Sequence, residues 1–329
     1  MQVMNAMVLD YPDAQFRRAL VPRPVPAAGQ VLVRIHASGV NPLDIKIRAG
    51  AAPHARHELP AILGMDLAGV VEALGPEAVR FHPGDAVYGM TGGVGGVPGT
   101  LAEYAAVDEA LLAHTPANLS MHEAAALPLV VITAWEGLVD RAHVRAGQTV
   151  LIHGGAGGVG HVAAQIARAL GASVFATHRG KDEAYVRSLG ATPIDAGRVG
   201  VEQYVRDHSA GAGFDLVYDT VGGVVLDASF AAVRRFGHVV SCLGWGSHLL
   251  APLSFKGATY SGVFTLIPLL SGEGRARHGE ILGDAARLAE RGLLVPRLDP
   301  RHYELDRVAE AYAAMASHSA AGKLVVSIE

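Results

Sequence analysis

The chain has 329 residues and a single cysteine, Cys242. With one thiol it can form neither an internal disulfide nor a zinc site built from several cysteines. Its 16 histidines are scattered, without a His-Glu-x-x-His pattern or another close ligand spacing. We therefore expect no metal site.

Long apolar runs and an excess of positive charge are also missing. No uninterrupted apolar run reaches about 18 residues, and the N-terminus has no charged segment followed by a signal-like apolar core. The net charge is −4 and the pI is near 6.5, which provides no basic surface for nucleic acid or for an anionic membrane. We expect a soluble, cytoplasmic protein.

Glycine, in contrast, is abundant, and one glycine-rich run stands in an informative context. The strand-like run 150–153 leads directly into a turn that meets the pattern G-x-G-x-x-G. Apolar residues at helical spacing follow as far as Leu170, and 172–177 indicates a second strand. This βαβ pattern is typical of a dinucleotide-binding site. The residues expected to bind the cofactor there are Gly155, Ala156, Gly157, Gly158, Val159 and Gly160.

Each glycine of the pattern has an expected physical role. The first permits a tight turn, the second lets the backbone approach a pyrophosphate, and the third lets the helix pack closely on the strand. The helix N-terminus supplies N–H groups and a partial positive charge for the phosphates. The alternative is a glycine-rich turn without a ligand.

The type of cofactor depends on the end of the second strand, where a protein that uses NAD usually has Asp or Glu for the ribose 2′-hydroxyl. This chain has Thr177-His178-Arg179-Gly180-Lys181 instead, which offers a hydroxyl and two cations to a 2′-phosphate. Tyr185, in a helix expected over 181–189, would either contact the adenosine or pack internally. These residues favour NADPH. The alternative is that Arg179 and Lys181 are ordinary solvated side chains.

A second glycine-rich run covers 92–99. A strand-like stretch over 101–107 follows it, so it lacks the helix N-terminus that binds phosphate. We interpret this run as a flexible connection that borders a substrate cleft.

The order of elements predicts two domains, as the chain length also favours. The first 120 residues contain short β-like runs between Pro and Gly turns, which indicates a mostly β domain. From about residue 124 strands and helices alternate, which predicts parallel strands with right-handed crossovers. The tail after about 261 needs a partner sheet, so we expect it to return to the first domain. The first expected domain is 1–123 with 262–329, and the second is 124–261. The strands expected after residue 124 are 150–153, 173–177, 214–218, 237–241 and 323–328. The helices expected in the tail are 279–291 and 305–316.

Several segments together resemble the medium-chain dehydrogenase/reductase superfamily, and within it the zinc-free quinone oxidoreductase branch that includes zeta-crystallin. The resemblance spans nearly the whole chain. It implies a GroES-like β domain split by a Rossmann domain with a doubly wound parallel sheet, a homodimer, and an active site between the domains. The segments that carry it are 39–48, 60–71, 81–87, Ala126-Leu127-Pro128 with Thr133-Ala134, the glycine-rich turn, and Gly322-Lys323-Leu324-Val325.

The resemblance also bears on zinc. Zinc-dependent members carry Gly-His-Glu where this chain has Gly64-Met65-Asp66, a cysteine near the position of Asn41, and four closely spaced structural cysteines. Without zinc as a Lewis acid, the resemblance implies hydride transfer from NADPH to a quinone or an α,β-unsaturated carbonyl. Two alternatives remain, an enoyl-thioester reductase and a non-catalytic NADPH-binding protein with a structural or regulatory role.

Site residues follow from the same resemblance. It places Asn41 and Thr133 beside the nicotinamide. Lys46 stands where several quinone oxidoreductases have Tyr, and it would anchor a substrate carbonyl or a phosphate, or be a surface lysine. Asp44 and Asp66 are expected to stabilise the local fold.

The remaining candidates concern the cofactor. Leu243, Gly244 and Phe264 match segments that reach the nicotinamide end through backbone groups. His318 falls where some relatives place an arginine that faces a phosphate, so the corresponding contact depends on a different side chain here.

Overall fold

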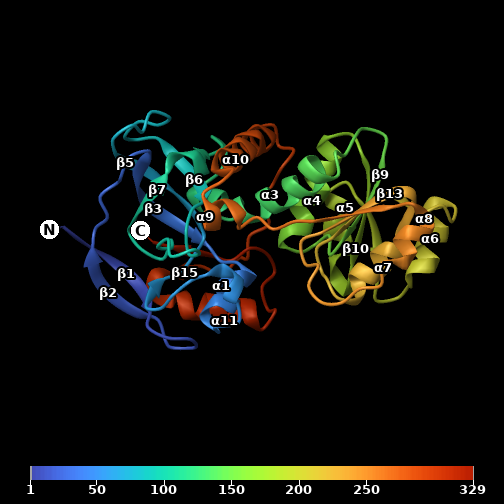
Figure 1. The fold of residues 1–329 in the computed structure, drawn as a ribbon, viewed down its shortest axis with the longest axis horizontal. Helices are drawn as coiled ribbons and strands as arrows, with labels where there is room; N and C mark the ends of the chain where they lie inside the picture. The colour runs from blue at the N-terminus through green and yellow to red at the C-terminus, as the bar shows by residue number, and fades with distance from the viewer. Residues whose placement is uncertain (1, 329) are drawn as a thin grey trace. The chain divides into compact units, whose positions relative to one another are not determined.

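The computed structural model describes residues 2–328, which fold into two compact units (Figure 1). Of the described residues, those up to 129, 266–292 and those from 296 onward form the first unit, and 130–265 with 293–295 form the second. The second unit is therefore inserted into the chain of the first, and the tail of the chain belongs to the same unit as its beginning.

The second unit is built on a six-stranded parallel sheet in the order β11-β10-β9-β12-β13-β14. From the central β9 the chain first proceeds to one edge and then returns to continue on the other side of β9. This is the doubly wound order of a Rossmann fold, as expected. The strands are β9 (Thr149–His153), β10 (Ser173–His178), β11 (Thr192–Asp195), β12 (Phe214–Asp219), β13 (Val233–Ser241) and β14 (Thr259–Gly262).

Helices cover both faces of this sheet. Figure 1 shows α4 on one side of the strands and α6, α7 and α8 on the other. The core between them includes Leu151, Phe214 and Phe230, all at most 2% exposed. The helical elements are α3 (Pro128–Trp135), η3 (Glu136–Arg141), α4 (Gly158–Ala169), η4 (Gly180–Asp182), α5 (Glu183–Ser188), α6 (Val201–Ser209), α7 (Val224–Ala232) and α8 (Ala251–Lys256).

The first unit is mostly β, as expected. A three-stranded sheet has the order β2-β1-β4, and a seven-stranded sheet has the order β15-β16-β3-β5-β6-β8, with β7 also paired to β3. The tail strand β16 pairs antiparallel with β3. The strands are β1 (Val3–Leu9), β2 (Arg17–Pro22), β3 (Gln30–Gly39), β4 (Ala61–Ile62), β5 (Asp66–Leu74), β6 (Ala86–Met90), β7 (Tyr104–Asp108), β8 (Leu112–His114), β15 (Tyr303–Glu304) and β16 (Val325–Ser327).

The helices of the first unit are short except for α10. At α1 the sequence explains the start, because Pro42 occupies the first turn and the Asp44 carboxylate accepts a hydrogen bond from the Asn41 backbone N–H at 2.8 Å. The helical elements are α1 (Pro42–Arg48), η1 (Pro53–Ala55), η2 (Glu109–Leu111), α2 (Met121–Ala125), α9 (Ile267–Ser271), α10 (Arg275–Glu290), η5 (Leu305–Arg307) and α11 (Val308–Ala316).

The second glycine-rich run, 92–99, is packed at its two ends, while Gly95 and Gly96 in its middle are exposed. A Cβ on Gly93 would lie 2.5 Å from the Gly64 carbonyl oxygen, and one on Gly99 would lie 2.3 Å from the Leu63 backbone. The Gly95 N–H also donates to the Ala55 carbonyl at 2.8 Å. Close backbone packing therefore requires glycine at 93 and 99, which the interpretation of the run as a flexible connection did not anticipate.

Candidate functional site

The candidate site of the second unit lies at one edge of its sheet. Because the strands are parallel, their carboxyl ends meet at the same edge, where doubly wound proteins bind ligands beside the point at which the strand order reverses. His153, His178, Asp219 and Ser241 end four of these strands, and all four are at most 6% exposed. The loops that follow them provide the candidate residues.

The glycine turn after β9 has the geometry of a phosphate-binding turn. Gly154, one position before the pattern begins, has the positive φ of 73° that the tight turn needs. A Cβ on Gly155 would meet the Ala176 side chain at 2.5 Å, and one on Gly160 would lie 2.0 Å from the Gly154 carbonyl oxygen. Gly160, the third glycine of the pattern, thus allows the close helix–strand approach expected for it. Gly155, the first glycine, is required because a side chain at this position would collide with β10.

The N-terminus of α4 is open to solvent. Gly157 is its N-cap residue, and Gly157 and Gly158 are exposed, while Ala156 and Val159 are half-buried. The first N–H groups of a helix have no partner within the helix and carry a partial positive charge. The twelve-residue α4 therefore presents a backbone cradle that fits a pyrophosphate.

The five-residue segment after β10 divides into two kinds of residue. Thr177 and His178 are buried, and the Thr177 hydroxyl accepts a hydrogen bond from the Gly154 N–H at 3.0 Å. Thr177 therefore holds the glycine turn. Arg179 and Lys181 are exposed.

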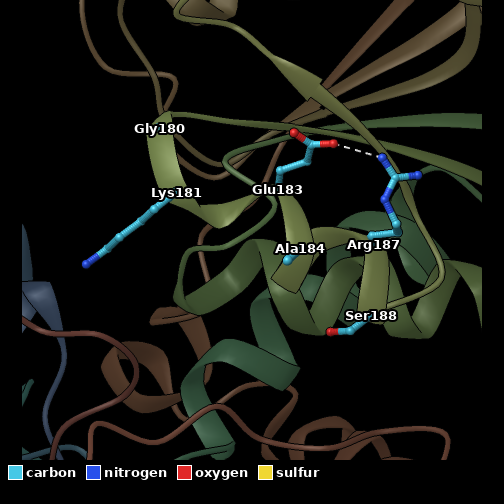
Figure 2. Close-up of a pocket in the computed structure, with 6 residues that line it drawn as sticks. All are labelled: Gly180, Lys181, Glu183, Ala184, Arg187 and Ser188. Carbon is cyan, nitrogen blue, oxygen red and sulfur yellow. Dashed lines mark hydrogen bonds and ion pairs between the residues drawn. The ribbon is translucent and has the colours of Figure 1, made fainter.

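Figure 2 shows the residues that line a hollow beside Lys181. Lys181 extends from η4, while Arg187 pairs with Glu183 at 2.9 Å along α5. The lining residues are Gly180, Lys181, Glu183, Ala184, Arg187 and Ser188. Tyr185, on the same helix, is half-buried.

Asp219 is a residue of this edge that the sequence analysis missed. Its carboxylate is fully buried and accepts hydrogen bonds from the Val221 N–H at 3.0 Å, the Gly222 N–H at 2.9 Å and the Ser241 hydroxyl at 2.7 Å. It therefore orders the loop after β12, directly beside the glycine turn. An aspartate that ends an apolar strand and precedes Thr-Val-Gly-Gly was the available signal.

His153 adds no positive charge to this edge. Burial lowers the pKa of His153 to about 4, so the imidazole is neutral at neutral pH. The Thr220 hydroxyl donates to the His153 carbonyl at 2.6 Å, which links the loops after β9 and β12.

Three further candidates follow β13 and β14. The Leu243 N–H donates to the Ser241 hydroxyl at 3.0 Å, and a Cβ on Gly244 would lie 2.3 Å from the Tyr260 hydroxyl. Phe264 makes an edge-to-face contact with Trp245, with ring centroids 6.2 Å apart. Leu243, Gly244 and Phe264 therefore flank the same sheet edge as the glycine turn.

The proposed nicotinamide contacts belong to both units. Thr133 lies on α3, is 5% exposed, and its carbonyl accepts a hydrogen bond from the Tyr218 hydroxyl at 2.6 Å. Asn41 and Lys46 belong to the first unit, where Lys46 is exposed on α1. His318 also belongs to the first unit and is exposed just beyond α11, with a φ of 53°.

Asn41 is held in a buried network in the first unit. Its side-chain Nδ2 donates to Asp66 at 2.8 Å, and its Oδ1 accepts from the Lys323 ammonium at 2.5 Å. Lys323 also donates to the Val40 carbonyl at 3.0 Å. Lys323 is a second residue that the sequence analysis did not assign to a site, although a lone lysine before the apolar run 324–326 was a signal.

Burial changes the ionisation of this network. It raises the pKa of Asp44 to about 7 and that of Asp66 to about 6, and it lowers the pKa of Lys323. The nearby Lys323 charge opposes the shift at both carboxyl groups. Asp44 accepts from the Asn41 backbone N–H, and Asp66 accepts from the Asn41 side chain and from the Leu129 N–H, so both carboxyl groups make local structural contacts.

The residues around Asn41 do not fit a zinc ion. Met65 is fully buried where zinc-dependent enzymes have histidine, and the Lys323 ammonium contacts the Asn41 amide. Within 2–328, no group of three or more His, Cys, Asp or Glu side chains is arranged to hold a metal. The same part of the chain includes no helix long and apolar enough to cross a membrane.

Two known families match the chain. The alcohol dehydrogenase GroES-like domain matches 27–117, and the zinc-binding dehydrogenase family matches 189–326.

Curated relatives cover most of the chain. The chain is 35% identical to a 2-methylene-furan-3-one reductase of Solanum lycopersicum, over 90% of the chain and 71% of the relative. It is 34% identical to a chloroplastic NADPH-dependent alkenal/one oxidoreductase of Arabidopsis thaliana, over 90% and 72%. It is also 34% identical to the spectinabilin polyketide synthase system protein NorB of Streptomyces orinoci. That match covers 92% of this chain but only 13% of the much longer relative.

Solved structures are similar along the whole chain. An alcohol dehydrogenase superfamily protein from Novosphingobium aromaticivorans has a TM-score of 0.98 and 62% identity, covering 99% of this chain and 100% of that one. The quinone oxidoreductase from Coxiella burnetii has a TM-score of 0.83 and 27% identity, covering 100% of both chains.

Proposed function

The chain is a member of the medium-chain dehydrogenase/reductase superfamily and of its quinone oxidoreductase branch, and on this premise we propose that it transfers a hydride from NADPH to a quinone or an α,β-unsaturated carbonyl. The observation that carries the proposal is the similarity to the alkenal/one oxidoreductase over 90% of the chain. The exposed glycine turn at α4 supports a nicotinamide dinucleotide as the cofactor.

NADPH is favoured over NADH by the side chains after β10. Arg179 and Lys181 are exposed cations, whereas an acidic residue at the strand end would repel a 2′-phosphate. Asp219 holds the adjoining loop in place. When bound, the reduced nicotinamide would supply the hydride.

The acceptor would be bound by residues that we place at the nicotinamide end. We propose that Asn41 and Thr133 hold the ring and the substrate, and that Lys46 attracts the carbonyl oxygen as negative charge grows on it. The backbone of Leu243 and Gly244, with Phe264, would line the same end. A reaction without zinc is favoured because Met65 is a buried methionine in place of a histidine ligand and because the positively charged Lys323 contacts Asn41.

The test is NADPH oxidation by the purified protein against quinones, enones, alkenals and crotonyl thioester. We expect turnover with quinones or enones. Asn41→Ala and Thr133→Ala should lower that rate, while Asn118→Ala, which removes an exposed asparagine of the first unit, should not. If both variants bind NADPH and turn over at the parent rate, the proposed placement of the active site is wrong.

A second candidate is enoyl-thioester reduction, which the match to a segment of a polyketide synthase protein favours. Turnover of crotonyl thioester with a higher kcat/KM than any quinone or enone would select it. Binding of NADPH without turnover of any acceptor would instead select the non-catalytic alternative.

Three further assignments accompany this proposal. We propose that the first unit is the catalytic domain, expected over 1–123 with 262–329, and that the second is the NADPH-binding domain, expected over 124–261. The compact units divide at 129/130 and 265/266, a few residues later. We also propose a cytoplasmic homodimer, for which light scattering should give twice the chain mass of 34.2 kDa.

A further inference from the structure

Four polar side chains are gathered inside the first unit. Asn41 and Asp66 are fully buried, Asp44 is 1% exposed and Lys323 is 5% exposed. They come from four segments, namely the residue before α1, α1 itself, the start of β5 and the segment before β16. Burying charged groups is costly unless each is paired or hydrogen-bonded, so a specific arrangement has to offset this cost.

The hydrogen bonds of the network determine which way the Asn41 amide points. An ammonium group can only donate, so Lys323 requires the carbonyl oxygen Oδ1, which lies 2.5 Å from Nζ. A carboxylate can only accept, so Asp66 requires the amino group Nδ2 at 2.8 Å. The other oxygen of Asp66 accepts from the Leu129 N–H at 3.0 Å, which fixes the carboxylate as well.

We propose that Lys323 is a positioning residue for hydride transfer, which with Asp66 holds the Asn41 amide so that Asn41 acts as a hydrogen-bond donor. The inference rests on the proposed function, in which Asn41 lies at the nicotinamide end. One Nδ2–H is taken by Asp66, and the second remains to stabilise negative charge that develops on the acceptor. The ammonium on Oδ1 draws electrons from the amide and makes that N–H a stronger donor.

The competing explanation is that Lys323 only balances buried charge. When all three groups are ionised, Asp44, Asp66 and Lys323 sum to −1, and Lys323→Met changes this to −2. Adding Asp44→Asn returns the sum to −1. The amide introduced by Asp44→Asn would still offer an oxygen to the Asn41 backbone N–H, but nothing would replace the ammonium at the Asn41 Oδ1. The double variant therefore separates charge balance from positioning.

The first measurement is independent of turnover. The chain has three asparagines, Asn5, Asn41 and Asn118, so labelling with 15N-asparagine gives three side-chain amide pairs for NMR. We expect one slowly exchanging pair in the parent protein, which disappears in Asn41→Ala. Asp44→Asn adds a fourth pair, identified as the one absent from the parent protein, and should keep the slow Asn41 pair. In Lys323→Met and in the double variant, the same pair should shift and exchange with solvent at least about tenfold faster.

The second measurement is kinetic. Charge balance alone predicts that the double variant regains both the thermal stability and the kcat that Lys323→Met loses. Positioning predicts that it regains stability while kcat stays about 10- to 100-fold below the parent, with the Kd for NADPH within about twofold. Asp44→Asn should keep the parent kcat.

The outcomes are distinguishable. Full recovery of kcat in the double variant would overturn the positioning role, and so would a fast-exchanging Asn41 amide in the parent protein. If the parent enzyme reduces no acceptor in the panel, the proposed function fails and the catalytic part of the inference falls with it, whereas the amide signals still report whether Lys323 holds Asn41.

Discussion

At the scale of single residues, the proposed function assigns the choice between NADPH and NADH to Arg179. Its guanidinium is exposed after β10, and it could form a charged hydrogen bond to a 2′-phosphate only with NADPH, because NADH lacks that phosphate. Arg179→Ala should therefore weaken NADPH binding by about ten- to a hundredfold and leave the Kd for NADH nearly unchanged. Titration calorimetry with both cofactors checks this, with Arg206→Ala, an exposed arginine on α6, as the control. Equal losses for both cofactors would sink the assignment.

Two glycines of one motif should behave differently on substitution. A Cβ on Gly160 would lie 2.0 Å from the Gly154 carbonyl oxygen, so Gly160→Ala should lower the free energy of unfolding by about 1–3 kcal/mol. At Gly157 the corresponding distance is 3.1 Å and φ is −76°. Gly157→Ala should therefore keep its stability within about 0.5 kcal/mol but bind NADPH at least about tenfold more weakly, because the methyl group obstructs the exposed cradle.

Urea unfolding and cofactor titration on the same two variants separate these effects. The interpretation would be contradicted if Gly160→Ala were as stable as the parent protein, or if Gly157→Ala bound NADPH normally.

At the scale of elements, one lysine closes the carboxyl end of α7. The Lys256 ammonium donates to the carbonyls of Phe230, Ala231 and Val233 at 3.1, 2.5 and 2.7 Å. The last carbonyls of a helix have no partner within it and carry partial negative charge. Lys256→Met should therefore lower the free energy of unfolding by about 1.5–3 kcal/mol. Urea unfolding measures this, and Lys181→Met, which removes an exposed lysine, should leave the stability unchanged.

The start of α1 should make folding stability depend on pH. The folded-state pKa of Asp44 is about 7, against an ordinary value of 3.8. The folded state thus keeps a proton that the unfolded state has lost, and the contribution of Asp44 to stability decreases as the pH rises from about 4 to 7. Asp66, Lys323 and Tyr312 of α11 interact with the same carboxyl group, so part of the effect is shared.

Asp44→Asn removes this titration. Unfolding free energies at pH 4.5 and 7.5 should therefore differ less in the variant than in the parent, by at least about 1 kcal/mol, since one pKa unit corresponds to about 1.4 kcal/mol. An identical pH dependence in both proteins would show that Asp44 has an ordinary pKa.

At the scale of the whole molecule, the sequence predicts those parts of the fold that depend on the spacing of residues close together in the chain. The strand, glycine turn and helix around 150–170 follow from apolar spacing and from glycine geometry, and the structure has them as β9 and α4. Gln165 is a polar residue within the apolar pattern of this helix. In the structure it is buried and bonds both the N–H and the carbonyl of Val295, at 2.9 and 3.0 Å.

Contacts between distant segments are what local patterns do not reveal. Lys323 reaches Asn41 across 282 positions in the chain, and its hydrogen bond depends on β16 pairing with β3. Asp219 and Ser241 meet because β12 and β13 are neighbours in the sheet. A single sequence shows that such residues are polar within apolar surroundings, but not which partner satisfies each of them.

The last prediction concerns metal content and follows from several sites together. Cys242 is the only cysteine, and burial raises the pKa of its thiol to about 12, whereas zinc binds the thiolate. Around Asn41, the Lys323 ammonium would repel a divalent cation. We expect the purified protein to contain far less than one zinc per chain by elemental analysis, and we expect EDTA to leave NADPH oxidation unchanged. One tightly bound zinc per chain, with activity lost on its removal and restored on its return, would contradict the zinc-independent mechanism.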